Sequence, residues 1–91
     1  MMEIRKKEVE NMQEKVKLIR QTFEISINDF ANLMGVTRQT IYNIENKKKV
    51  LTQTQYLAIC SLIHMALKEQ PEKEKIVTTI LDTNYNRVGR N

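Results

Sequence analysis

The amino-acid sequence predicts an all-α fold, a compact bundle of about five helices. Only two glycines and one proline occur among the 91 residues, which favours helices over turns. Apolar residues also recur at helical spacing in several segments of the chain. This length suffices for one small domain, which we place at residues 1–82, followed by a flexible tail at residues 83–91.

The first expected helix has a clear apolar face, but the sequence allows two different N-terminal starts. Asn11 followed by Glu14 could cap the helix, or residues 1–10 could form an added helical extension. The sequence does not choose between these two starts. The apolar face is predicted from residues at spacings of four, three and four, which are Met12, Val16, Ile19 and Phe23.

Two short helices separated by a glycine follow. Ser26 begins a capping-box pattern, which predicts a helix from Ile27. Gly35 is expected to end this helix, because glycine readily adopts the left-handed conformation found just past a helix end. Thr37 can cap the next helix, which we expect over residues 38–46.

The second half of the chain predicts a basic loop and two further helices. Residues 47–51 are expected to form the loop. Thr52 begins another capping-box pattern, which predicts a fourth helix over residues 53–68. The proline that follows suits the first turn of a fifth helix, expected over residues 71–82. The β-branched run at residues 76–80, IVTTI, could instead form a strand.

The third expected helix has two chemically different sides. At about 100° per residue, Ile41 and Ile44 fall together on one side and are expected to be buried. Guanidinium and amide groups on the opposite side can make paired hydrogen bonds to base edges in a major groove. An ordinary solvated helix face is the alternative interpretation, but it must also explain the glycine turn and the clustered charge. The polar side carries Arg38, Gln39, Tyr42, Asn43 and Asn46.

The positive charge of the chain is concentrated beside this helix. The formal net charge is +4, and residues 36–50 carry four basic residues against Glu45 alone. Three of the four are the consecutive Lys47, Lys48 and Lys49, which suit phosphate oxygens. Together these features favour a polyanionic partner, in particular double-stranded DNA.

Several classes of function are disfavoured by what the sequence lacks. It has one histidine, His64, one cysteine, Cys60, and no glycine loop that would cradle a phosphate. We therefore expect no enzyme activity, no metal site and no cofactor. No apolar run approaches the roughly 20 residues that span a bilayer, and the N-terminus lacks a signal-peptide pattern. We expect a cytoplasmic protein with no membrane contact.

The run SINDFANLMGVTRQTIYNIEN, residues 26–46, carries a recognisable set of residues at fixed spacing. It resembles the helix-turn-helix of Cro/repressor-type (XRE-like) DNA-binding transcriptional regulators, and the resemblance extends from Arg20 to about Ile63. It implies a lambda-repressor-like DNA-binding domain, with the helix-turn-helix formed by the second and third helices. The matching residues are Phe30, Ala31, Gly35, Thr37, Gln39, Ile41, Ile44, Glu45 and Asn46.

The resemblance also implies roles for individual residues. Arg20 and Glu45 match a pair that forms an internal ion pair in many members of the family. Ile27 and Lys47 depart from the family pattern, which often has a polar residue and a glycine at these positions. The base-reading positions are occupied by Arg38, Gln39, Tyr42 and Asn43, and the phosphate-binding positions by Thr37, Thr40, Asn46, Lys47, Lys48 and Lys49.

These features together predict a sequence-specific DNA-binding transcriptional regulator, most simply a repressor. A homodimer would read a pseudo-palindromic operator in successive major grooves, about 34 Å apart. The alternative is an antitoxin or another protein-interaction module on the same fold, which would bind a partner protein. A dimeric adaptor without a DNA role is a third possibility, against which the basic loop argues.

Overall fold

The computed structural model describes the backbone of residues 5–90 and the side chains of residues 5–82. Within this part of the chain there are five α-helices, one short 3-10 helix and no strand. The predicted all-α bundle is therefore confirmed. The helices are α1 (Lys6–Thr22), α2 (Ile27–Met34), α3 (Arg38–Glu45), α4 (Gln53–Glu69) and α5 (Glu74–Arg90), with the 3-10 helix η1 (Pro71–Lys73) before α5.

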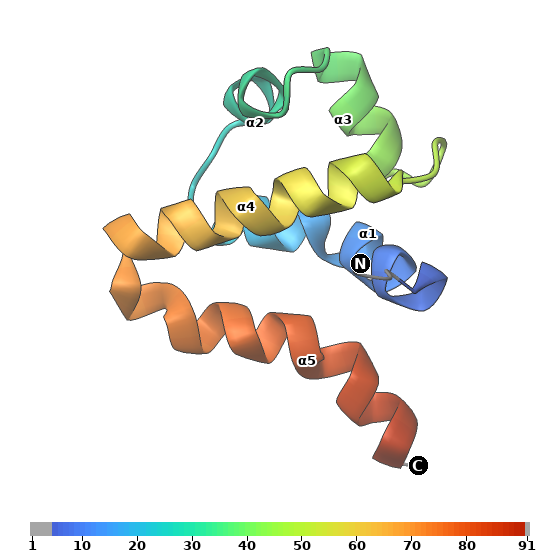
Figure 1. Cartoon of the computed structure of the whole chain (residues 1–91), viewed down its shortest axis with the longest axis vertical. Helices are drawn as coiled ribbons and strands as arrows, with labels where there is room; N and C mark the ends of the chain where they lie inside the picture. The colour runs from blue at the N-terminus through green and yellow to red at the C-terminus, as the bar shows by residue number, and fades with distance from the viewer. Residues whose placement is uncertain (1–4, 91) are drawn as a thin grey trace.

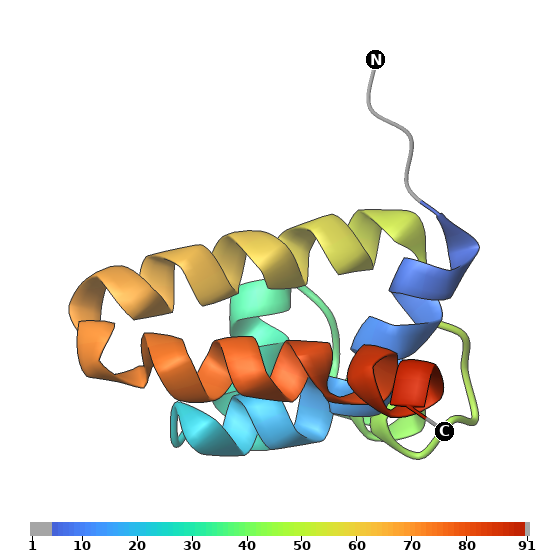
Figure 2. The ribbon, with the colours of Figure 1, turned by 90° about the horizontal axis from the view of Figure 1, so that it is seen from below.

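Helix α1 lies at the centre of the arrangement and contacts α3, α4 and α5 (Figure 1). The short pair α2 and α3 packs together on one side of α1 and α4, and α5 runs along the opposite side. Figure 2, seen from the side of α5, shows this helix in front of the other elements, between α4 and α1 in that view. The helix-turn-helix pair is therefore held on one face of a scaffold built by α1, α4 and α5.

The core is mostly aliphatic, with Phe23 and Phe30 as aromatic members, and collects residues from every α-helix. Ile41 and Ile44 of α3 are each only 1% exposed, as the two-sided pattern of this helix predicts. Burying side chains of this size stabilises the fold by about 1.5–3 kcal/mol each. The predicted apolar face of α1 is also buried and comprises Met12, Val16, Ile19 and Phe23.

Local capping signals set where three of the helices begin. The hydroxyl of Ser26 accepts a hydrogen bond from the backbone N–H of Asp29, and α2 begins at the next residue. The hydroxyl of Thr52 accepts from the N–H of Gln55, whose side chain accepts from the N–H of Thr52. This reciprocal pair is a complete capping box, and it confirms the predicted start of α4. The hydroxyl of Thr37 caps α3 in the same way, with the N–H of Thr40 as donor at 3.1 Å.

Helices α1, α2 and α3 all end in the same backbone motif. In each, one residue just past the helix has positive φ, and the next N–H donates to a carbonyl five residues earlier. This is the Schellman arrangement, which satisfies carbonyl groups left without partners at a helix end. Gly35 (φ 73°) ends α2 as predicted, whereas Glu24 and Lys47 (both φ 59°) take this conformation without the freedom of glycine.

The structure settles the start of the first helix. Helix α1 begins at Lys6, preceded by Arg5, so the helical extension is correct for residues 6–10 and Asn11 is not the cap. Val9 explains this, because it lies one turn before Met12 and is likewise 6% exposed, which prolongs the buried face. The expected extension over residues 1–4 lies outside the described residues.

The last helix forms where it was expected, but its ends differ: residues 71–73 form the 3-10 helix η1, and α5 begins at Glu74. Residues 76–80 are helical, because burying Val77 and partly burying Ile80 and Leu81 requires the spacing of a helix rather than that of a strand. The helix also continues to Arg90, beyond the end expected at residue 82. Between Pro71 and Gly89 the sequence contains neither proline nor glycine to interrupt it. The flexible tail expected at residues 83–91 stays a prediction.

Lys73 connects the start of the last helix to the end of the first. Its Nζ donates to the backbone carbonyl of Thr22 at 2.6 Å and lies 3.8 Å from a carboxylate oxygen of Glu24. The same ammonium group lies over the Phe23 ring, 5.8 Å from its centroid. A cation at this position also complements the negative end of the α1 dipole.

Candidate nucleic-acid interface

The outer face of α3 carries the residues predicted to read bases. Arg38, Gln39 and Tyr42 are exposed, with Tyr42 45% accessible, and Asn43 is half-buried beside them. Since Ile41 and Ile44 anchor the opposite side in the core, these four side chains lie on one surface. The structure therefore brings the four predicted base-reading residues together.

Two amide side chains on this face are already paired. Nε2 of Gln39 donates to Oδ1 of Asn43 at 3.1 Å, across one turn of the helix. Each amide has two N–H groups and a carbonyl oxygen with two lone pairs, so a single bond leaves both with unused hydrogen-bonding capacity. This pairing restricts the rotamers of both side chains and presents a donor–acceptor edge of the kind that binds adenine.

The predicted phosphate-binding residues lie at the two ends of α3. At its N-terminus, the Oγ1 atoms of Thr37 and Thr40 are 2.9 Å apart, where the helix dipole favours a negative charge. At its C-terminus, the side-chain Nδ2 of Asn46 donates to the Tyr42 carbonyl at 2.8 Å. Asn46 therefore uses part of its hydrogen-bonding capacity to end the helix.

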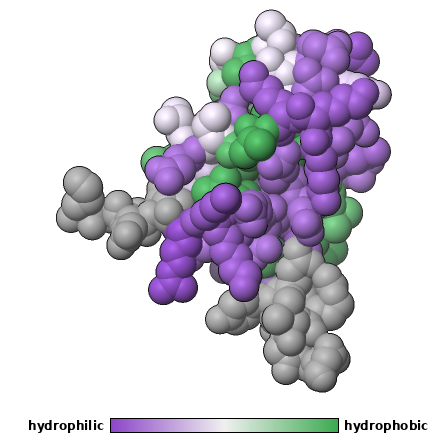
Figure 3. Space-filling view, turned by 90° about the vertical axis from the view of Figure 1, so that its right-hand side faces the viewer, coloured by the Kyte–Doolittle hydropathy of each residue, from purple (hydrophilic) through white to green (hydrophobic). Residues whose placement is uncertain are grey.

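The three consecutive lysines follow α3 and are all exposed. Nζ of Lys47 lies 3.5 Å from a carboxylate oxygen of Glu14, but both side chains face solvent, so the pair contributes little to stability. Nζ of Lys48 lies over the Tyr42 ring, 5.6 Å from its centroid. Figure 3 views the molecule from the side on which this loop lies, and the surface there is mostly hydrophilic, with an apolar patch near its centre.

Arg20 and Glu45 form a two-pronged ion pair between α1 and α3. Nε of Arg20 donates to one carboxylate oxygen at 2.8 Å, and its Nη2 donates to the other at 3.1 Å. A third nitrogen, Nη1, donates to the Ile25 carbonyl at 3.0 Å. The Arg20 and Glu45 side chains are 12% and 4% exposed, so the pair is well shielded from solvent. It fixes the C-terminal end of α3 relative to α1.

Gln13 is a further residue at this site, and the sequence did not reveal it. Its Nε2 donates to the carbonyls of Ile44 and Lys49, at 3.0 and 2.7 Å, and its Oε1 accepts from the N–H of Leu51 at 3.1 Å. One side chain of α1 thus holds both ends of the loop between α3 and α4. No local pattern distinguishes it from a surface glutamine, because all of its partners lie more than 30 residues away.

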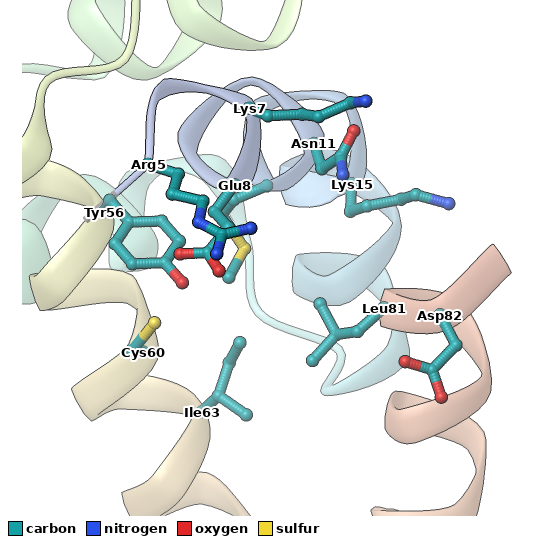
Figure 4. A pocket seen from close by; sticks show the side chains of 11 residues that line it. Arg5, Lys7, Glu8, Asn11, Lys15, Tyr56, Cys60, Ile63, Leu81 and Asp82 are labelled. Carbon is teal, nitrogen blue, oxygen red and sulfur yellow. The ribbon is translucent and has the colours of Figure 1, made fainter. Parts of the chain in front are cut away.

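A separate pocket of about 490 Å³ lies between the first half of α1, α4 and α5 (Figure 4). Its lining mixes apolar side chains with charged ones from α1 and with Asp82 of α5. The ammonium groups of Lys7 and Lys15 point away from the centre of the pocket (Figure 4). These two lysines therefore contribute no charge to the centre of the pocket.

Tyr56 and Cys60 of α4 line this pocket and are partly buried. Burial, together with the neighbouring Cys60 thiol and the Glu8 carboxylate, raises the pKa of the Tyr56 hydroxyl above its ordinary value of 10.0. Tyr56 is protonated at neutral pH with or without this shift, and its side chain packs against the core.

A helix-turn-helix whose second helix exposes guanidinium and amide groups beside a basic loop defines a class of protein, the DNA-binding regulators. The helix-turn-helix family model matches residues 16–69, more than half of the chain, from within α1 to the end of α4. The chain belongs to the Cro/C1-type (XRE) helix-turn-helix family of DNA-binding proteins. No curated protein and no solved structure matches it. In the part of the chain that the structure describes, none of the helices is long and apolar enough to cross a membrane.

Proposed function

We propose that this protein is a sequence-specific transcriptional regulator, most simply a repressor, that reads a pseudo-palindromic operator as a homodimer. The observation that carries the proposal is the outer face of α3, where Arg38, Gln39, Tyr42 and Asn43 lie together on an anchored helix. An α-helix fits the major groove of DNA, and these side chains match the hydrogen-bonding patterns of guanine and adenine.

The proposed contacts divide into two kinds. Arg38, Gln39, Tyr42 and Asn43 read base edges, because they share the exposed face of α3. The residues at the two ends of α3 bind phosphates and orient the helix without reading sequence. This second group comprises Thr37, Thr40, Asn46, Lys47, Lys48 and Lys49.

A homodimer would place two copies of α3 in successive major grooves, about 34 Å apart. Exposed apolar side chains on α4 and α5 support a protein contact in the C-terminal half: Leu57 is 48% exposed, and Met65 and Ile76 are each 54% exposed. The same residues favour the second candidate function, a module such as an antitoxin that covers a partner protein. The molar mass of the purified protein in solution, with and without a co-expressed neighbouring gene product, distinguishes these two uses.

The test of the proposed function is selection of the purified protein on a randomised duplex library at near-physiological salt. We expect enrichment of a two-fold symmetric sequence whose half-site spacing gives the dimer geometry. Weak binding without sequence preference would contradict a specific regulator. It would leave only the electrostatic attraction of the lysines for phosphates.

The assignment of base-reading residues makes a separate prediction. Arg38→Ala or Gln39→Ala should relax the preference at one position of each half-site, at about 1–3 kcal/mol. Selection repeated with each variant measures this change. The matched control is Gln21→Ala, an exposed glutamine of α1, which should keep the full preference. If both α3 variants select the same sequence as the unaltered protein, the assignment is wrong.

A further inference from the structure

The loop between α3 and α4 makes few hydrogen bonds of its own. Lys47 and Lys48 donate their N–H groups back to carbonyls at the end of α3, at 3.1 and 2.8 Å. Among the described backbone–backbone bonds, none has residues 49–51 as donors. The N–H of Leu51 instead finds its acceptor on a side chain, at Oε1 of Gln13. The second half of the loop therefore depends on α1 for its conformation.

Gln13 is held rigidly enough to impose that conformation. It follows Met12, which is 6% exposed, and lies one turn before Val16, which is 1% exposed. These two residues anchor that part of α1 in the core. Its amide then bonds to the carbonyls of Ile44 and Lys49 and to the N–H of Leu51. The bonded segment, from residue 44 to residue 51, includes all three lysines of the loop.

The chemistry of the site requires a glutamine. The loop presents two carbonyls and one N–H to α1, so the matching group needs two donors and one acceptor. Only a side-chain amide offers this combination on one planar group. Asparagine is one methylene shorter, and a glutamate of the same length has no N–H to donate when it is ionised.

We propose that Gln13 is a positioning residue for DNA binding, which holds Lys47, Lys48 and Lys49 in the conformation that contacts phosphates. This inference rests on the proposed function. A loop ordered before binding loses less conformational entropy when it meets DNA than a mobile one does. Gln13 acts through the lysines and touches no base, so it affects affinity and salt dependence but not sequence preference.

The experiment compares Gln13→Met with the matched control Gln21→Met, on the selected duplex over a range of salt concentrations. Methionine keeps the length and helix propensity of glutamine but removes all three hydrogen bonds. The plot of log affinity against log salt has a negative slope, and each lost phosphate contact should make it less steep by about 0.9. We also expect about tenfold weaker binding near physiological salt. A residue that only stabilised the fold would leave the slope of the folded protein unchanged.

A double-mutant cycle shows whether the effect passes through the lysines. In a variant with Lys47, Lys48 and Lys49 all changed to Gln, adding Gln13→Met should cause no further loss of affinity. An equal loss in both backgrounds would overturn the proposal. Amide hydrogen exchange of the unaltered protein needs no variant to fold, and it should show Leu51 protected relative to Val50. Exchange of the Leu51 amide at the rate of an unfolded chain would also overturn it.

Failure of this inference is distinguishable from failure of the proposed function. If the unaltered protein shows no salt-dependent binding to any duplex, the DNA-binding function and the role of Gln13 both fall. If its affinity falls steeply with salt concentration and Gln13→Met leaves that dependence unchanged, only the role proposed for Gln13 is wrong.

Discussion

Lys47 shows at the scale of one residue how stability and function can oppose each other. Its φ of 59° lies in the left-handed region, where an L-residue with a Cβ atom is disfavoured by about 1–2 kcal/mol. Glycine, which is common at this position in the family that the sequence resembles, would adopt it more readily. Lysine instead adds a positive charge next to those of Lys48 and Lys49, beside α3.

Lys47→Gly should therefore raise the free energy of unfolding by about 1 kcal/mol, because glycine relieves the backbone strain. It should also weaken binding to all duplexes alike, because the phosphate contact proposed for Lys47 would be lost. Urea unfolding and a salt titration measure the two effects. Glu24→Gly is the matched control, since Glu24 has the same φ but lies outside the loop. A destabilised Lys47→Gly protein would show that the lysine side chain contributes more than its backbone costs.

At the scale of helices, the position of α3 depends on two side chains of α1. Gln13 holds the loop that leaves α3, and Arg20 pairs with Glu45 at the end of α3. The two contacts differ in energetics. The Glu45 carboxylate is 4% exposed, so removing either member of its pair leaves a poorly solvated charge.

Glu45→Gln should lower the free energy of unfolding by about 3 kcal/mol, because Arg20 then keeps its charge without a compensating partner. The double variant Arg20→Met, Glu45→Leu should recover a large part of this loss, since it buries apolar groups instead of an ion pair. Urea unfolding of the single and double variants gives both values. A double variant less stable than Glu45→Gln would show that the pair itself, rather than the unpaired charge, governs stability.

At the scale of the whole molecule, α5 completes the bundle from outside the segment matched by the family model. It packs on α1, with Val77 2% exposed in the common core. Lys73 adds a polar contact at the start of this interface, where it satisfies the Thr22 carbonyl at the end of α1. The scaffold that carries α3 therefore includes the C-terminal helix.

Lys73→Met should lower the free energy of unfolding by about 1–2 kcal/mol, through the lost hydrogen bond to the Thr22 carbonyl. The sequence selected from a duplex library should not change, because α3 and its loop are untouched. Lys75→Met, at an exposed lysine two residues further along in α5, is the matched control and should have little effect on stability. A change in the selected sequence would mean that α5 takes part in positioning α3.

The sequence by itself determined the features of this protein that depend on near neighbours in the chain. Ser26, Thr37 and Thr52 mark helix starts, and Gly35 marks a helix end, because capping bonds join residues only a few positions apart. The periodicity of Ile41 and Ile44 likewise separated the buried side of α3 from the outer side.

Only the tertiary structure decided which distant groups meet. The partners of Gln13 are 31 to 38 residues away, and the Arg20–Glu45 pair spans 25 residues. For the ion pair the resemblance to a family supplied the expectation, but no comparable signal marked Gln13. The start of α1 also depended on packing, because the sequence left two starts open and the burial of Val9 decided between them. Contacts between residues far apart in the sequence depend on the path of the whole chain, so no local sequence pattern predicts them.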